Sequence, residues 1–312
     1  MAGKRSSTAL APALGPGVEE CWMDIDGARM RYLRTAAHHQ VAETANDRKR
    51  QPPPLVLIHG LLGYSFSWRR TLPALAPYTT VYAPDMLGAG FSDRPSGLDN
   101  SLRATARRLL RFIAGLKVSS FDLLGTSHGG AVAMMMAAEC AERTKHSHGL
   151  RLRRLVLAEP VNPFSSHGRW LAPFVGGPLG TALFRLLVAP TRFLYPHVHS
   201  RMYGDRKRIP AGAIEGYTAP LEIPGLFEHA LGIVSTWTPD LKQLKAELPK
   251  LADFPTLFIW GSKDEAVPLS SVVPLAKYFR HSETVIFPGI GHLPYEECPE
   301  DFNRALIEFL TR

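Results

Sequence analysis

Cysteine is scarce in this sequence, with only Cys21, Cys140 and Cys298 among its 312 residues. The three are widely spaced and odd in number, and no Cys-x-x-Cys pattern occurs. The sequence therefore indicates neither a disulfide framework nor a cysteine metal site. Such usage is typical of a reducing compartment, so we expect a cytoplasmic protein, with no metal and no cofactor.

Long apolar runs are also missing, and no stretch of the chain is long enough to span a membrane. Residues 1–17 have no sustained apolar core because residues such as Pro12 and Gly15 interrupt it, so a signal peptide is not indicated. We expect residues 1–19 to be disordered, and we expect no integral membrane association.

Concentrated positive charge is the third absence, although the net charge is +8. The basic residues are scattered along the chain, and one group falls on one side of a helix predicted over residues 101–116. That spacing is typical of a solvated helix face: Arg103, Arg107, Arg108 and Arg111. No pattern suggests base recognition, so we expect no nucleic-acid partner.

Strand-like and helix-like segments alternate along most of the chain, which predicts an α/β fold with a mostly parallel sheet. The Asp26-Gly27 pair is a hairpin signal, so an antiparallel pair is expected to open the sheet. The alternation stops after Pro160 and resumes near Leu241. We therefore expect a core of residues 20–160 and 239–312, with a helical cap at 161–238.

The run Gly125-Thr126-Ser127-His128-Gly129 is the most informative feature that is present. An apolar strand-like stretch precedes this Gly-x-Ser-x-Gly pattern and an Ala/Met-rich helix follows, which is the context of a nucleophile elbow. The glycines let strand and helix approach closely. Ser127 is the predicted nucleophile and the His128 backbone N–H a predicted oxyanion donor. The competing interpretation is a glycine-rich turn with an incidental serine.

A serine nucleophile needs a base, and that base needs an orienting acid. His292, on a Gly-rich loop between a strand and the last helix, is the predicted base. Asp264 follows an apolar strand that ends at Gly261 and is the predicted acid. Glu265 and Glu159 are the alternatives, Glu159 because it follows another predicted strand.

A second oxyanion donor is expected after the apolar run 55–58, which ends in His59-Gly60. The glycine allows a turn that aims the Leu61 backbone N–H inward, with His59 bracing the loop. Asp85 and Ser92, on a later glycine-rich loop, are expected to hold that loop by local hydrogen bonds.

Together these motifs resemble the α/β-hydrolase superfamily, in its capped, esterase-like and epoxide-hydrolase-like branch. The matching elements follow the family's order of serine, aspartate and histidine: His59-Gly60, the loop 85–92, the elbow 125–129, Gly261-x-x-Asp264 and Gly291-His292. The resemblance covers about residues 20–312. It implies a mostly parallel eight-stranded sheet flanked by helices, with the cap inserted after the sixth strand.

The expected function is a carboxylesterase-like serine hydrolase that acts on a small-to-medium apolar ester through an acyl-enzyme. Epoxide hydrolases and haloalkane dehalogenases of this fold carry aspartate at the elbow, so Ser127 argues against both activities. The same triad leaves open a carbon–carbon bond hydrolase, a cofactor-free perhydrolase or haloperoxidase, and an acyltransferase. A non-catalytic ligand-binding receptor of this fold is the alternative of another class.

The predicted cap contains strongly apolar segments at 170–175 and 183–188, which are expected to form its core or an acyl pocket. Acidic residues of the cap could instead bind a substrate amine, as in proline iminopeptidase relatives: Glu215, Glu222 and Glu228. Their scatter makes this the weaker hypothesis. The oligomeric state stays open.

Overall fold

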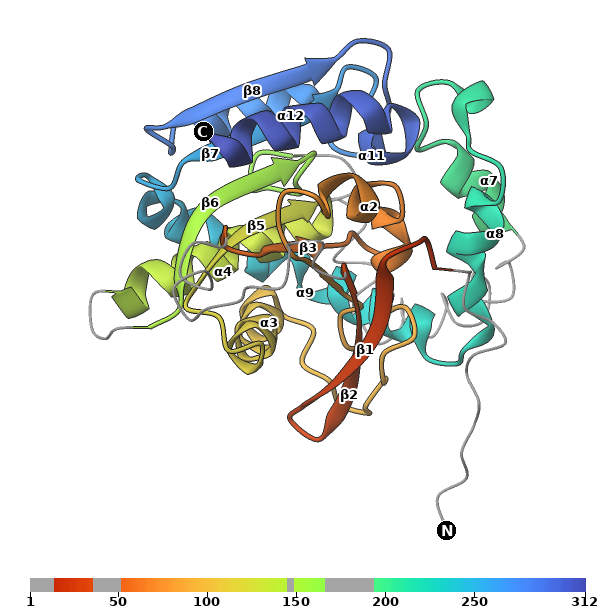
Figure 1. The fold of residues 1–312 in the computed structure, drawn as a ribbon, viewed down its shortest axis with the longest axis horizontal. Coiled ribbons are helices and arrows are strands. Elements are labelled where there is room, and N and C mark those ends of the chain that lie inside the picture. The colour runs from red at the N-terminus through yellow and green to blue at the C-terminus, as the bar shows by residue number, and fades with distance from the viewer. Residues whose placement is uncertain (1–13, 36–51, 145–148, 166–193) are drawn as a thin grey trace.

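A central eight-stranded sheet organises the molecule, in the order β1-β2-β4-β3-β5-β6-β7-β8. The computed structural model describes residues 14–35, 52–144, 149–165 and 194–312 (Figure 1). The strands are β1 (Val18–Ile25), β2 (Ala28–Thr35), β3 (Leu55–Ile58), β4 (Val81–Pro84), β5 (Ser120–Thr126), β6 (Arg151–Ala158), β7 (Thr256–Gly261) and β8 (Ser282–Phe287). Together with flanking helices and a helical insertion after β6, they confirm the predicted fold class.

The sheet opens with the predicted antiparallel hairpin of β1 and β2, whose turn is Asp26-Gly27. Both turn residues have positive φ, 57° and 80°, as the favoured two-residue hairpin turn requires. β1 begins at Val18, inside the segment predicted to be disordered, and residues 1–13 lie outside the described residues. The start of β1 was missed because its sequence is polar and carries no apolar pattern. The ion pair between Glu19 and Arg34, which lie opposite each other on β1 and β2, supports the strand there.

The strands from β3 onward pair in parallel, which places their carboxyl ends along one edge of the sheet. Strands β3 and β7 are buried along their whole length. Buried parallel strands read as continuous apolar runs, which is why the sequence located them well. Loops that follow these strands meet at one edge, where ligands bind in folds of this kind.

Helices cover both faces of the sheet. One core cluster packs α3 (Leu102–Gly115), α4 (His128–Thr144) and α10 (Val272–Ala276) against it. The other packs α2 (Thr71–Leu75) and α12 (Pro299–Thr311) against the opposite face, with α11 (Pro294–Glu297) just before α12. Short 3-10 helices complete the connections: Ser65–Trp68, Arg206–Arg208, Ala219–Glu222, Leu248–Leu251 and Leu269–Ser271.

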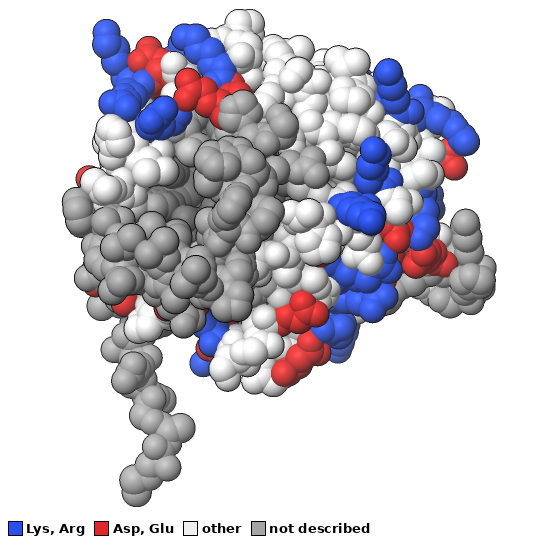
Figure 2. Space-filling view, turned by 180° about the vertical axis from the view of Figure 1, so that it is seen from behind, with Lys and Arg blue, Asp and Glu red and all other residues white. Residues whose placement is uncertain are grey.

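The arginines of α3 correct one prediction in part. Arg107 and Arg111 are 48% and 50% exposed, as a solvated face predicts, whereas Arg103 and Arg108 are turned toward the protein. Arg103 and Arg107 both pair with Glu139 of α4. Arg108 is buried and donates to the carbonyl of Asp99. Helical periodicity located the polar stripe, but it could not reveal Glu139, the acid on the neighbouring helix that pairs with Arg103 and Arg107. Elsewhere, Figure 2 shows basic side chains interspersed with acidic ones.

The insertion after β6 is helical in its described part, with α7 (Tyr195–Ser200), α8 (Ala213–Thr218) and α9 (Leu226–Glu247). Figure 1 shows α7 and α8 together at one side of the sheet. α9 continues through the predicted end of the cap at residue 238, because Pro239 lies inside the helix instead of breaking it. The apolar segments 170–175 and 183–188 lie outside the described residues. None of the described helices has the length and apolarity to cross a membrane.

Candidate active site

Ser127 sits on a strained turn between β5 and α4, with φ of 52° in the left-handed region. A Cβ atom at Gly125 would lie 2.2 Å from the carbonyl oxygen of Gly129, and one at Gly129 would lie 2.3 Å from that of His59. Neither position has room for a side chain. The strand–turn–helix geometry predicted from the Gly-x-Ser-x-Gly pattern is therefore present.

The backbone of this turn is bonded to the end of β6 and to the chain that follows it. The Ser127 N–H donates to the carbonyl of Ala158 at 3.1 Å. The Ser127 carbonyl accepts from the N–H groups of Gly130 and Val161, each at 2.9 Å. These bonds on both sides of the residue hold the strained conformation in place.

The predicted base and acid lie in direct contact. His292 Nδ1 is 2.8 Å from Asp264 Oδ2. The other carboxylate oxygen, Oδ1, accepts from the N–H groups of Ala266 and Val267 at 2.8 and 2.9 Å. The backbone N–H of His292 donates to the carbonyl of Met202 in the inserted segment at 2.7 Å. Asp264 is thus fixed by its own loop, and with Nδ1 donating to it, His292 Nε2 can accept a proton.

Glu159, the alternative acid at the end of β6, lies beside this pair but differs in its bonding. Its Oε1 accepts from the Gly261 N–H at 2.7 Å. Its Oε2 is 4.0 Å from His292 Nδ1 and has no hydrogen-bond partner among the described residues. Full burial, followed by the charge of Asp264, raises the pKa of Glu159 well above its usual value. Glu159 therefore favours a neutral carboxyl group.

Glu265, the other alternative acid, points to solvent. Its side chain is 76% exposed and lies 3.9 Å from the Arg201 guanidinium. Of the three acids, the structure places Asp264 closest to the imidazole.

Both predicted oxyanion donors lie next to the serine. A Cβ atom at Gly60 would be 3.1 Å from Ser127 Cβ, so the loop after β3 packs directly on the elbow. The cavity that Ser127 lines is also lined by Leu61. Within the described chain, the backbone N–H groups of Leu61 and His128 donate to no protein acceptor. Two main-chain donors are therefore available near the nucleophile.

Ser127 and His292 line one cavity of about 300 Å³, closed partly by the inserted segment. The rest of its wall is mainly apolar or aromatic, for example Leu61, Val161, Met202 and Trp237. No Lys or Arg occurs among its described lining residues. A larger hollow of about 700 Å³ lies between α2 and α12 and includes none of the predicted site residues.

Sequence reasoning missed His199. It lines this cavity from α7, and its ring centroid is 4.2 Å from that of Tyr217. Burial lowers the pKa of His199 to about 4, so the ring is neutral near pH 7. The surrounding sequence is irregular and carries no signal that could have revealed this contact.

The side chains of Glu159, Asp264 and His292 also lie close enough together to hold a metal ion, with ligand atoms within 4.8 Å of one another. Both oxygens of Asp264 already accept hydrogen bonds, however, and burial favours a protonated Glu159. This bonding suits acid–base chemistry better than metal ligation.

Known proteins with similar sequences point to the same fold as the structure. The family model for the alpha/beta hydrolase fold matches residues 53–299. The chain is 28% identical to haloalkane dehalogenase 2 of Mycobacterium bovis, over 95% of this chain and 96% of the relative. It is 27% identical to 2-hydroxymuconate semialdehyde hydrolase of Pseudomonas sp. strain CF600, over 83% and 87%.

Solved structures are similar across nearly the whole chain. Cfl2 from Burkholderia cenocepacia has a TM-score of 0.76 at 20% identity, covering 95% of this chain and 98% of that one. The 2-hydroxy-6-oxo-6-phenylhexa-2,4-dienoate hydrolase of Rhodococcus sp. strain RHA1 has a TM-score of 0.73 at 21% identity, covering 95% and 99%. At these identities the likeness concerns the fold.

Proposed function

The chain belongs to the α/β-hydrolase fold family, and from that premise we propose that it is a serine hydrolase cleaving carboxylic esters of small-to-medium apolar acids. One observation carries the proposal. A serine on a strained elbow and an Asp-bound histidine line the same mainly apolar cavity.

The chemistry follows from the geometry. His292 Nε2 takes the proton of Ser127 Oγ as that oxygen attacks the ester carbonyl. The Leu61 and His128 N–H groups stabilise the oxyanion, while Asp264 stabilises the imidazolium. The proton then passes to the leaving alkoxide, which departs as the alcohol. A water molecule, deprotonated by His292, attacks the acyl-enzyme, and the free acid leaves as Ser127 regains its proton.

The lining of the cavity supports an uncharged apolar acyl group. A buried methylene contributes about 0.8 kcal/mol. We therefore expect kcat/KM to rise roughly fourfold per added carbon and then to stop when the chain meets the wall. A volume of about 300 Å³ suits short or medium chains.

A carbon–carbon bond hydrolase is the second candidate, because the chain is similar to 2-hydroxymuconate semialdehyde hydrolase over most of its length. A muconate-type substrate carries a carboxylate, and the described lining of the cavity has no Lys or Arg to pair with it. This favours the ester.

Dehalogenation, the activity named for the Mycobacterium relative, fits the chain less well. A serine that displaced a halide would form an ether, which an activated water molecule does not hydrolyse. The perhydrolase, haloperoxidase and acyltransferase alternatives use the same groups and differ in what attacks the acyl-enzyme.

The test is a panel of p-nitrophenyl esters of graded chain length, together with labelling by a fluorophosphonate, and Ser127→Ala as the matched control. Serine hydrolysis predicts rapid labelling and a fall in kcat of about 10⁴-fold or more in the variant, without loss of fold. Turnover by Ser127→Ala within tenfold of the wild type would refute the proposal. A dienone substrate run in parallel separates the second candidate, which predicts faster turnover of the dienone than of any ester. If the protein neither reacts with the fluorophosphonate nor turns over any substrate, a non-catalytic ligand-binding receptor of this fold is favoured.

A further inference from the structure

The Leu61 N–H, one of the two proposed oxyanion donors, belongs to a peptide unit whose carbonyl has identifiable partners. The Leu61 N–H lies in a turn, where no helix or strand ladder fixes its direction. It shares a planar trans peptide unit with the Gly60 carbonyl, so the two groups point in opposite directions. Whatever holds the Gly60 oxygen therefore aims the Leu61 N–H.

The Gly60 oxygen has two partners, the His59 ring and the Gly63 N–H. His59 Nδ1 lies 2.9 Å from it, and the Gly63 N–H donates at 3.1 Å. On the other side of the ring, His59 Nε2 accepts from the Met86 N–H at 3.0 Å. Since a backbone N–H can only donate, Nε2 carries no proton, and Nδ1 must be the donor to Gly60.

The ring is held in this one tautomer by its surroundings. His59 is completely buried, and burial lowers its pKa, so the neutral form persists. The neighbouring Asp85 N–H donates to the carbonyl of Arg31 on β2, which anchors the Met86 backbone to the sheet.

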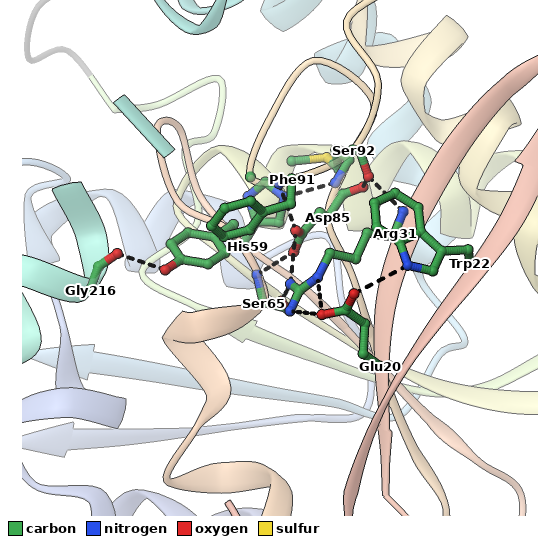
Figure 3. A network of polar contacts seen from close by, with 12 residues as sticks. Glu20, Trp22, Arg31, His59, Ser65, Asp85, Phe91, Ser92 and Gly216 are labelled. Carbon is green, nitrogen blue, oxygen red and sulfur yellow. Dashed lines mark hydrogen bonds and ion pairs between the residues drawn. The ribbon is translucent and has the colours of Figure 1, made fainter. Parts of the chain in front are cut away.

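A buried polar network fixes the loop that carries Met86 (Figure 3). Asp85 Oδ1 accepts from the Ser65 N–H at 2.8 Å. Its Oδ2 accepts from the Phe91 N–H at 3.0 Å and from Arg31 Nη1 at 3.1 Å. The Arg31 guanidinium also bonds Glu20 of β1 at 2.9 Å. Ser92 Oγ donates to the Asp85 carbonyl at 2.6 Å, so both predicted loop-holding residues take part.

We infer that His59 is a positioning residue that aims and polarises the Leu61 N–H toward the developing oxyanion. The inference rests on the proposed function, since it presumes an oxyanion at Ser127. A carbonyl that accepts a hydrogen bond makes the N–H of the same peptide unit a stronger donor. The substrate carbonyl oxygen becomes negatively charged only as the transition state forms. Loss of the His59 hydrogen bond to Gly60 should therefore lower kcat rather than raise KM.

A matched pair of variants tests this. In His59→Asn the side-chain amide nitrogen takes a place close to that of Nδ1 and still donates to the Gly60 oxygen. In His59→Gln the amide lies nearer the place of Nε2, so it keeps a partner for the Met86 N–H and loses the donor to Gly60. With p-nitrophenyl butyrate, we expect kcat to fall about 10- to 100-fold in His59→Gln. We expect His59→Asn to stay within about fivefold of the wild type, and KM to change little in both.

The affinity for butylboronic acid, whose tetrahedral adduct with Ser127 mimics the oxyanion, should fall in parallel with kcat. A merely structural role would instead lower Tm in both variants and leave their kcat ratio near one. Equal losses of kcat, or a loss confined to KM, would overturn the inference.

A measurement on the wild-type protein covers the case in which the variants do not fold. Nitrogen-15 NMR of the ring should show His59 protonated at Nδ1, with Nε2 coupled to the Met86 amide, before and after butylboronic acid binds. An Nε2-protonated ring would overturn the inference. This readout needs no turnover: a protein with the Nδ1 tautomer that fluorophosphonate does not label refutes the proposed hydrolase, not the geometry of His59.

Discussion

Strands β6 and β7 are neighbours in the sheet, and each is followed by an acidic residue whose carboxyl group lies beside the His292 imidazole. Glu159 follows β6 and accepts one backbone N–H, with its second oxygen unpaired. Asp264 follows β7 and accepts two backbone N–H groups besides its contact with His292. Each acid follows an apolar strand in the sequence, yet the two carboxyl groups have different hydrogen-bond partners.

The difference lies in burial and in the number of hydrogen-bond donors that each carboxyl group has. Each donor stabilises the charged form and offsets the cost of burial. Asp264 accepts two backbone N–H groups in addition to its contact with His292 Nδ1. Glu159 is buried with one donor and a charged neighbour, which raises its pKa and favours the neutral acid.

Of these changes, replacing Asp264 should have the largest effect on kcat. Asp264→Asn turns an amide N–H toward His292 Nδ1, which forces the ring proton onto Nε2, where it blocks acceptance from Ser127. We expect kcat to fall by about 10⁴-fold. Ester turnover at equal folded fraction measures it, with fluorophosphonate labelling slowing in step. A loss smaller than tenfold would mean that Glu159 serves as the acid.

Replacing Glu159 should lower the stability of the protein more than its activity. Glu159→Ala leaves the Gly261 N–H without its acceptor and opens a cavity in a fully buried place. We expect the free energy of unfolding to fall by about 2–4 kcal/mol. Denaturant titration of this variant beside Glu159→Gln, which keeps the acceptor, isolates the effect. Equal stability of the two variants would contradict it.

Glu159→Gln sharpens the comparison through pH. A raised pKa in the folded state stabilises the protein fully below the unfolded pKa of about 4.3, and this is lost as pH rises toward the folded pKa. Glutamine mimics the protonated acid at every pH. We expect the wild type to lose stability relative to this variant above about pH 5, by at most about 1.4 kcal/mol per pH unit.

Thermal unfolding of both proteins between pH 5 and pH 8 measures this difference, and parallel profiles would show that Glu159 is ionised. Ester turnover by Glu159→Gln should stay within about threefold of the wild type, because Asp264 keeps its contact with the imidazole.

The smallest effect is expected at the third acid. The Glu265 side chain is exposed and only loosely paired with Arg201. Glu265→Gln should leave kcat unchanged and shift the free energy of unfolding by less than about 0.5 kcal/mol. The same kinetic assay and denaturant titration serve as a control for removing a carboxylate near the site. A tenfold fall in kcat here would require a role that its position does not provide.

Much of the fold could be predicted because its signals are local. Apolar runs located β3, β5 and β7, and the Asp26-Gly27 turn located the opening hairpin. The last helix, expected after the loop of His292, runs over Pro299–Thr311. The start of β1 and the continuity of α9 through Pro239 escaped, because an ion pair and tertiary packing support them against the local pattern.

The sequence by itself determined the elbow, since the steric demand at Gly125 and Gly129 acts within a few residues. It also named the three acids that could serve His292. Only the tertiary structure places Asp264 in contact with the imidazole, and only it shows the burial that raises the pKa of Glu159 and the hydrogen bonds that select one tautomer of His59. Protonation depends on burial and on donors that come from distant parts of the chain, such as Met86 for His59 and Gly261 for Glu159.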